Sequence, residues 1–303
     1  MPAIDTNGVT LTYETQGNPG DPPLLLIMGL GMQLTSWPDS FCSALAERGF
    51  HVIRFDNRDS GLSTKLQQFG MPNVKIAFVK SMLRIRVASG YTLHDMAKDS
   101  VGLLDALGID KAHIVGASMG GMIAQVMAAD YPERTLSMTS IMSSSGRRGL
   151  PGPKKEVRDA MLSRLGDPND INAVVNRSVK FLQMIGSPGY PIPAATLAER
   201  VIASIGRNVS PDGVARQLHA VIASGDRVPL LKKIRAQSLV IHGSADPLVP
   251  IACGRDTAAS ILGATLREID GMGHNLPPQL DEILTDMIDA HCRGTPIPEA
   301  VRG

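Results

Sequence analysis

The chain has 303 residues, a formal net charge of +1 at pH 7 and 43% hydrophobic residues, an ordinary composition for a globular protein. This balance does not indicate nucleic acid or an anionic membrane as a partner. The three cysteines, Cys42, Cys253 and Cys292, form neither a disulfide framework nor a metal pattern. No signal peptide is visible at Met1–Asn7, and no apolar run reaches the ~18 residues of a bilayer span. We therefore expect a cytoplasmic protein without stable membrane insertion.

Strands and helices are expected to alternate along most of the chain. Alternating apolar residues at 8–15 suit an antiparallel edge strand, whereas the continuous apolar run at 24–28 suits a strand buried on both faces. This alternation predicts a mostly parallel sheet with helices on both faces. In chain order, we expect strands at 8–15, 24–28 and 51–55 with a helix at 36–48, a helix at 92–107, a strand at 112–115, a helix at 122–129, strands at 136–142, 238–242 and 264–269, and a helix at 281–291.

Two segments interrupt this alternation. Residues 67–90 form an apolar insert that could be an association surface or part of a pocket wall. Residues 145–231 show helical patterns separated by Pro- and Gly-rich breaks, one of them at Gly166-Asp167-Pro168. We interpret 145–231 as a helical cap of about four helices, inserted into a core made of residues 1–144 and 232–303. The sequence leaves the oligomeric state undetermined.

The most informative motif is a serine between a buried strand and a helix. The apolar run at 112–115 is followed by Gly116-Ala117-Ser118-Met119-Gly120, and good helix formers come next. Strand, tight turn with a central serine, and helix together form the nucleophile elbow. Glycines at both sides of the serine allow close backbone approach, and a strained serine lifts its hydroxyl above the sheet. Ser118 is therefore the candidate nucleophile.

An acid and a base follow later strands in the order that this elbow requires. Asp246 follows the strand at 238–242, and His274 follows the strand at 264–269 in a Gly-rich loop. The carboxyl ends of parallel strands lie at one edge of the sheet, where ligands bind. His274 can take the proton of Ser118 and return it to a leaving group, and Asp246 would orient the imidazole. Asp270 is a weaker candidate acid because it lies too close to His274 in sequence.

Backbone N–H groups are expected to stabilise the oxyanion. Met119 follows the nucleophile and supplies one donor, and Leu30, in the turn after the strand at 24–28, supplies the second. Four side chains near this position are candidates for an apolar pocket, although methionines also commonly fill core gaps. These candidates are Met28, Met32, Trp37 and Met122.

Other polar residues are expected to have structural roles. Asp56 and Arg58 suit a buried polar network beneath the site. The sequence contains no Gly-rich phosphate loop, metal-ligand cluster or dinucleotide fingerprint. We therefore expect neither a metal nor a cofactor.

Four motifs together resemble those of the α/β-hydrolase superfamily, and the resemblance covers nearly the whole chain outside the cap. The chain departs from it in two places: Met28-Gly29 stands where many members have His-Gly, and Asp59 stands where many have glycine. The motifs are Gly116-Ala117-Ser118-Met119-Gly120-Gly121, Asp56-x-Arg58-x-x-Gly61-x-Ser63, Gly243-x-x-Asp246-x-x-x-Pro250 and Gly273-His274.

Met28-Gly29 together with Arg58-Asp59-x-Gly61 is similar to a group of bacterial esterases that includes aclacinomycin methylesterase. The resemblance implies an α/β-hydrolase fold and hydrolysis of a carboxylic ester, with a methyl ester as the narrower case, without a cofactor. Our main hypothesis is a serine carboxylesterase that acts on an apolar or aromatic small-molecule ester and water. A lactonase, a C–C bond hydrolase or a cofactor-free perhydrolase would use the same triad, because the pocket decides among them. The alternative outside catalysis is a small-molecule sensor.

Overall fold

The computed structural model describes residues 1–162 and 170–299. Its core is one eight-stranded sheet in the order β1-β2-β4-β3-β5-β6-β7-β8. β1 and β2 are antiparallel to their neighbours. The other six strands, β4, β3, β5, β6, β7 and β8, run parallel to one another. The strands are β1 (Ala3–Thr6), β2 (Val9–Gln16), β3 (Pro23–Ile27), β4 (His51–Phe55), β5 (Ala112–Ala117), β6 (Thr135–Ile141), β7 (Gln237–Gly243) and β8 (Thr265–Ile269).

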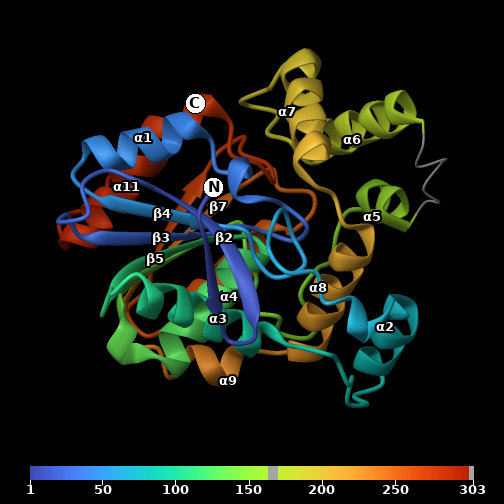
Figure 1. The fold of residues 1–303 in the computed structure, drawn as a ribbon, viewed down its shortest axis with the longest axis horizontal. Coiled ribbons are helices and arrows are strands. Elements are labelled where there is room, and N and C mark those ends of the chain that lie inside the picture. The colour runs from blue at the N-terminus through green and yellow to red at the C-terminus, as the bar shows by residue number, and fades with distance from the viewer. Residues whose placement is uncertain (163–169, 300–303) are drawn as a thin grey trace.

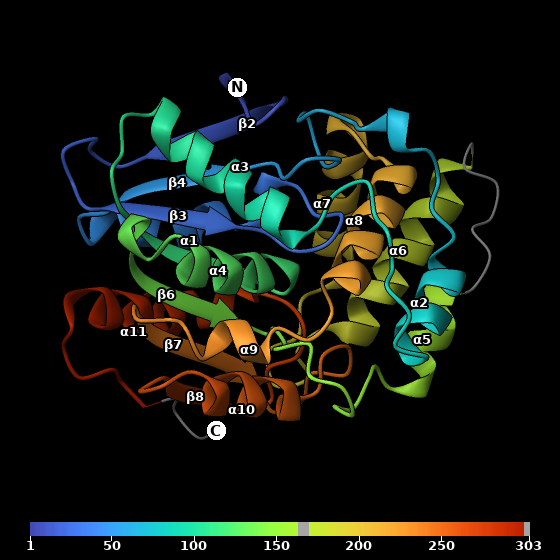
Figure 2. The ribbon, with the colours of Figure 1, turned by 90° about the horizontal axis from the view of Figure 1, so that it is seen from below.

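Helices cover both faces of the sheet and bury an apolar layer on each. On one face, α3 (Leu93–Ala106), α4 (Met119–Asp130) and α9 (Val228–Leu231) enclose a core that includes Leu25, Ile114 and Ile123. On the other face, α1 (Asp39–Glu47) and α11 (Asp281–Arg293) pack over Leu24, Val115 and Ile241. Figure 2 shows α3, α4 and α9 on the near side of the sheet and α1 and α11 behind it. α10 (Ile251–Ser260) packs on β7 and β8.

The inserted segment between β6 and β7 forms the expected helical cap. It contains α5 (Lys155–Leu162), α6 (Ile171–Ile185), α7 (Ala194–Arg207) and α8 (Pro211–Ser224). These helices stand together on one side of the sheet, at the right of Figure 1. Gly166-Asp167-Pro168, which we expected to break two cap helices, lies outside the described residues. Val175, Val179, Leu197 and Val201 give α6 and α7 a small apolar core of their own.

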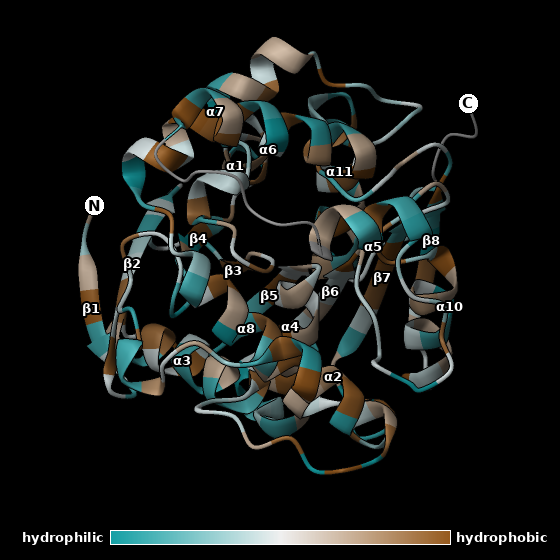
Figure 3. Cartoon of the chain, turned by 90° about the vertical axis from the view of Figure 1, so that its right-hand side faces the viewer, coloured by the Kyte–Doolittle hydropathy of each residue, from teal (hydrophilic) through white to brown (hydrophobic). Residues whose placement is uncertain are grey.

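The insert at 67–90 contains α2 (Val74–Met82), a helix that lies outside the layers that cover the sheet. α2 packs against α8 of the cap, and Ala77 is its only buried residue. Asn73 caps the start of α2 by accepting a hydrogen bond from the N–H of Ile76 at 3.0 Å. Figures 1 and 3 show α2 at the outer margin of the molecule.

The fold class and nearly all expected elements are confirmed, with two corrections. β2 is not an edge strand, because the short and half-exposed β1 pairs with its outer side. The first helix begins at Asp39 rather than Ser36, because Pro38 has an extended backbone and residues 34–36 form a separate 3₁₀ turn. No helix within the described residues is long and apolar enough to cross a membrane.

Candidate active site

Ser118 lies at the turn between β5 and α4 in the strained conformation of a nucleophile elbow. Its φ of 55° lies in the left-handed region, which is uncommon for a residue with a side chain. The flanking glycines are required sterically: a Cβ on Gly116 would lie 2.1 Å from the carbonyl oxygen of Gly120. Likewise, a Cβ on Gly120 would lie 1.9 Å from the carbonyl oxygen of Ile27. The sequence thus lets β5 turn directly into α4.

The structure brings the three candidate catalytic side chains together in one hydrogen-bonded chain. His274 Nε2 lies 3.0 Å from Ser118 Oγ, and His274 Nδ1 lies 2.7 Å from Asp246 Oδ2. Asp246 and His274 are 4% and 8% exposed, so water does not compete strongly for these contacts. Asp246 Oδ1 is fixed separately by the N–H groups of Leu248 and Val249, at 2.9 and 2.8 Å. Its other oxygen is therefore aimed at the imidazole.

The loop after β3 lies against the nucleophile. A Cβ on Gly29 would lie 3.1 Å from Ser118 Cβ, a tight contact that glycine avoids. The N–H groups of Leu30 and Met119 donate to no backbone carbonyl within the described residues. Met119 is the first residue of α4, where N–H groups lack partners within the helix. Both donors are therefore available to a ligand.

Two cap segments hold the loops that carry the site. Gln217 on α8 accepts a hydrogen bond from the N–H of Gly31 at 2.7 Å and donates to the carbonyl of Arg58 at 2.7 Å. On the other side, Ser187 Oγ accepts from the N–H of Gly273 at 2.8 Å. The N–H of His274 donates to the carbonyl of Ile185 at 2.7 Å. The cap thus holds both the loop after β3 and the loop that carries His274.

The polar loop after β4 forms the expected buried network, and it also reaches the cap. Asp56 accepts from the N–H groups of Leu34 and Leu62, and its Oδ2 lies 2.7 Å from Arg207 of α7. Arg58 binds both oxygens of Asp99 on α3, each at 2.6 Å.

Asp59 makes the second ion pair to the cap. It has a φ of 68°, which explains why glycine suits this position, and it pairs with Arg216 of α8 at 2.6 and 2.9 Å. It also accepts from the Tyr91 hydroxyl at 2.9 Å.

The four pocket candidates lie in different environments. Trp37 is fully buried in the core beneath α1 and stacks on Phe41 at 5.4 Å between ring centroids. Met28 is also buried, at 5% exposure. Met32 is 41% exposed in the loop after β3, and Met122 is half-buried on the first turn of α4. Met32 and Met122 are therefore the two candidates with surface exposed to solvent.

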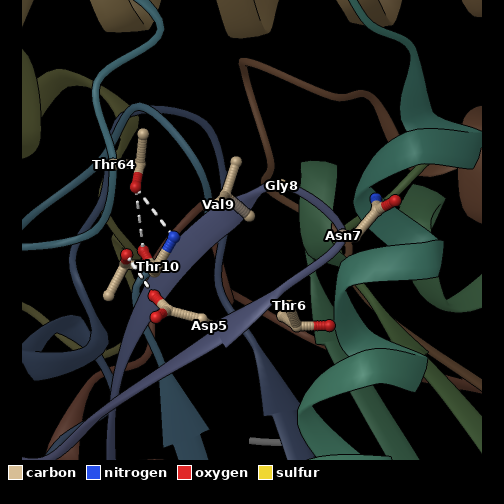
Figure 4. A pocket seen from close by; sticks show the side chains of 7 residues that line it. All are labelled: Asp5, Thr6, Asn7, Gly8, Val9, Thr10 and Thr64. Atoms are coloured by element: carbon tan, nitrogen blue, oxygen red, sulfur yellow. Dashed lines mark hydrogen bonds between the residues drawn. The ribbon is translucent and has the colours of Figure 1, made fainter.

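Two hollows in the described structure lie away from the hydroxyl of Ser118. One, of about 420 Å³, lies at the β1–β2 turn and is drawn in Figure 4. Several of its polar side chains are already paired: Thr10 donates to Asp5 at 2.6 Å, and Asn7 donates to Asp99 on α3 at 2.8 Å. The other, of about 450 Å³, lies between α5, α6 and the loops next to His274 and Asp246, and includes Ser187, Pro247 and Asn275 in its lining.

Several residues that support the site were not predicted. Ser143 Oγ donates to the carbonyl of Ser118 at 2.7 Å. His242 is buried next to Asp246, donates to the carbonyl of Val249 at 2.7 Å, and has its pKa lowered by burial. Ser187, Gln217 and the cap arginines carry no sequence motif. Their partners are far away in the chain, so only the fold reveals these contacts. Within the described residues, no cluster of histidine, cysteine and acidic side chains could hold a metal.

Comparisons with known proteins bear on the family and fold of this chain. The family model of the alpha/beta hydrolase fold matches residues 22–174. The chain is 30% identical to the rhodomycin D methylesterase of Streptomyces sp. (strain C5), covering 97% of this chain and 98% of that protein. Among solved structures, it is similar to the enol-lactonase from Burkholderia xenovorans LB400, with a TM-score of 0.69 and 24% identity over 96% of this chain and all of that one.

A second solved structure, the meta-cleavage product hydrolase from Pseudomonas fluorescens IP01, has a TM-score of 0.75 at 20% identity. It covers 97% of this chain and 98% of that one. At these identities, the two solved structures bear on the fold alone. The family match and the full-length methylesterase similarity show that this chain belongs to the α/β-hydrolase fold family.

Proposed function

We propose that the protein is a serine carboxylesterase, with Ser118 as nucleophile, His274 as base and Asp246 as the acid that orients it. The single observation that carries this proposal is the continuous hydrogen-bonded chain from Ser118 through His274 to Asp246, at 3.0 and 2.7 Å. A serine hydroxyl is a weak nucleophile unless a neighbouring base takes its proton. This geometry provides that base directly at the elbow.

The first half-reaction transfers the acyl group to the enzyme. Ser118 Oγ attacks the ester carbonyl carbon while its proton passes to His274 Nε2, and the carbonyl oxygen becomes an oxyanion. The N–H groups of Leu30 and Met119 donate to that oxyanion, and Asp246 stabilises the imidazolium. The C–O bond then breaks, and the leaving alcohol takes the proton from His274.

The second half-reaction regenerates the serine. His274 takes a proton from a water molecule, whose oxygen attacks the acyl carbon. The second oxyanion uses the same two donors. When it collapses, Ser118 Oγ leaves, recovers the proton from His274, and the carboxylic acid is released. Neither half-reaction needs a metal or a cofactor, because all proton transfers use His274.

The proposed substrates are methyl esters of apolar or aromatic carboxylic acids. The 30% identity to a rhodomycin D methylesterase over nearly the full length supports the methyl leaving group. Met32 and Met122, which are partly exposed, would give an adaptable apolar wall. We also propose that the chain divides into a core of 1–144 and 232–303 and a cap of 145–231, except that α9 at the end of this range packs with the core. The cap would close the acyl site against water.

The test compares wild type with Ser118→Ala and with a control variant, Ser36→Ala. Ser36 is a half-buried serine before α1. Each is assayed with methyl and p-nitrophenyl esters of increasing acyl size, a lactone panel and a vinylogous diketone. We expect ester turnover in wild type and Ser36→Ala, and a loss of about 10⁶-fold in kcat in Ser118→Ala. Turnover that survives in Ser118→Ala would refute the mechanism. Turnover confined to lactones or diketones would refute the ester assignment, and tight ligand binding without product would favour a sensor.

A further inference from the structure

The outer surface of α2 and the turn after it carries an unusual combination of exposed side chains. Its apolar residues are between 51% and 70% exposed, although side chains of this kind are normally buried. We call this set the insert patch. It consists of Ile76, Phe78, Val79, Met82, Leu83 and Ile85.

The helical geometry of α2 explains why these side chains face outward. Val74, Ala77 and Ser81 follow helical spacing and are the less exposed residues of the helix, with Ala77 buried against the cap. Ile76, Val79 and Leu83 repeat with the same spacing on the opposite face. In Figure 3, apolar segments of α2 lie at the margin of the molecule, away from the sheet. The insert patch is thus a second apolar face on a helix that already has a packed one.

The charges of the insert itself, from the loop before α2 to the turn after it, have a single sign. Lys75, Lys80, Arg84 and Arg86 are exposed within or beside it. No acidic residue occurs in the sequence between Asp59 and Asp95. Within the part of the chain that the structure describes, none of these four cations forms a salt bridge. The insert therefore carries a local basic surface, although the net charge of the whole chain is close to zero.

We propose that the insert patch docks the protein on an anionic lipid surface. An amphipathic helix with apolar side chains on its outer face and lysine or arginine around them binds in the interfacial plane of a bilayer. Apolar side chains enter the headgroup boundary, while the long basic side chains reach the lipid phosphates. This is peripheral association and needs no spanning helix.

Charge decides between a lipid surface and a second copy of the chain. Two insert patches facing each other would place four cations against four, with no acidic residue from either patch to neutralise them. Anionic lipid supplies the missing negative charge. This proposal is independent of the esterase assignment, because it concerns a surface outside the site and its test measures binding rather than turnover.

The test uses the full chain and sedimentation with vesicles of phosphatidylcholine containing one third phosphatidylglycerol, beside vesicles of phosphatidylcholine alone. We expect wild type to bind the mixed vesicles much more strongly, and to bind less as salt is raised. Lys80→Gln/Arg84→Gln should weaken binding about 5-fold for each charge removed. Ile76→Ser/Leu83→Ser should weaken it at least ~10-fold.

Matched control variants distinguish an effect of the insert patch from the effect of removing any exposed apolar or basic side chain. Leu262→Ser removes an apolar side chain that is 92% exposed before β8, and Lys232→Gln/Lys233→Gln removes two exposed cations after α9. Neither should change vesicle binding. Thermal unfolding verifies that every variant is folded, and sedimentation velocity without lipid reports self-association.

Four results would overturn the proposal: no binding to the mixed vesicles, equal binding to neutral vesicles, equal weakening by the control variants, or a dimer that Ile76→Ser/Leu83→Ser dissolves while vesicle binding is absent.

Discussion

Gln217 illustrates how one uncharged side chain can couple the cap to the chemistry. Its amide oxygen holds the N–H of Gly31, next to the proposed donor Leu30, and its amide nitrogen holds the carbonyl of Arg58. The side chain is fully buried, so water cannot replace either bond. We therefore propose Gln217 as a positioning residue for the loop that carries the proposed donor Leu30, and not as a catalytic residue.

We predict that Gln217→Leu lowers kcat for ester hydrolysis by about 10- to 100-fold, with little change in KM. The physical reason is that a correctly placed Leu30 N–H stabilises the transition state more than the bound ester, so its displacement raises the barrier and leaves ground-state binding nearly unchanged. Gln217→Glu keeps the acceptor for Gly31 and should retain more activity than the leucine variant. Steady-state kinetics measure both effects, with Gln279→Leu as a control, because Gln279 also bonds a backbone carbonyl but is exposed. Equal kcat in Gln217→Leu and wild type would contradict the positioning role.

Individual residues also show what sequence reasoning can and cannot assign. The approach of Ser118, Asp246 and His274 was predictable, because motif order and strand ends determine which loops meet. The side-chain environments of Met28 and Trp37 were not. Both occur close to the oxyanion loop in sequence, yet Met28 is buried and Trp37 packs on Phe41 under α1. Proximity along the chain does not specify which side of a sheet a side chain faces.

Among the elements, the contact between the β4 loop and α8 depends on a buried ion pair. Asp59 and Arg216 are 1% and 4% exposed, and the carboxylate also holds the hydroxyl of Tyr91 and the N–H of Leu66. Removing one member of a buried pair leaves the other charge in a low-dielectric environment, whereas removing both charges is far less costly.

We predict that Arg216→Met lowers the free energy of unfolding by about 3–5 kcal/mol, because it leaves the Asp59 carboxylate without a cation. The double variant Asp59→Asn/Arg216→Met should recover a large part of this loss, since no charge then remains unpaired. Urea unfolding of the single and double variants measures the difference. Lys155→Met breaks an exposed pair with Asp159 and should change stability by less than ~1 kcal/mol. A double variant less stable than Arg216→Met would contradict this account.

The features that could not be predicted from the sequence have one thing in common: no local apolar pattern marks them. Continuous apolar runs identify β3 and β5 because both faces are buried, and periodic apolar residues identify α3. β1 has four residues that are exposed or half-exposed, so no apolar pattern marks it. The pairing of Asp59 with Arg216 joins residues 157 positions apart, a distance at which no local pattern carries information.

For the whole molecule, the cap and core share a single polar framework. Asp56 with Arg207 and Asp59 with Arg216 tie α7 and α8 to the loop after β4, and Ser187 with Gly273 ties the segment after α6 to the histidine loop. The general cap insertion was predictable from the absence of strands at 145–231. Its attachment was not, because each of these contacts depends on the final packing of elements distant in sequence.

The histidines make the stability of this assembly sensitive to acid. Burial lowers the pKa of His51, His113, His219, His242 and His291, and that of His113 falls to about 4. A histidine with a depressed pKa stays neutral in the native state while the unfolded chain takes up a proton. Its contribution to stability is therefore present above the unfolded pKa of ~6.5 and is lost as pH falls below it. For His113, the loss continues until about pH 4.

We therefore predict that the urea midpoint of wild type falls as pH is lowered from neutrality to 5. His113 lies 2.8 Å from Ser137 Oγ and packs edge-on against Phe50, where a charged ring is unfavourable. His113→Gln keeps a polar partner for Ser137 but cannot titrate, so the fall between the two pH values should become smaller. His94→Gln is the control, because His94 is exposed and pairs with Asp130 at the surface. An unchanged pH dependence in His113→Gln would show that the acid sensitivity resides in other groups, such as the remaining buried histidines.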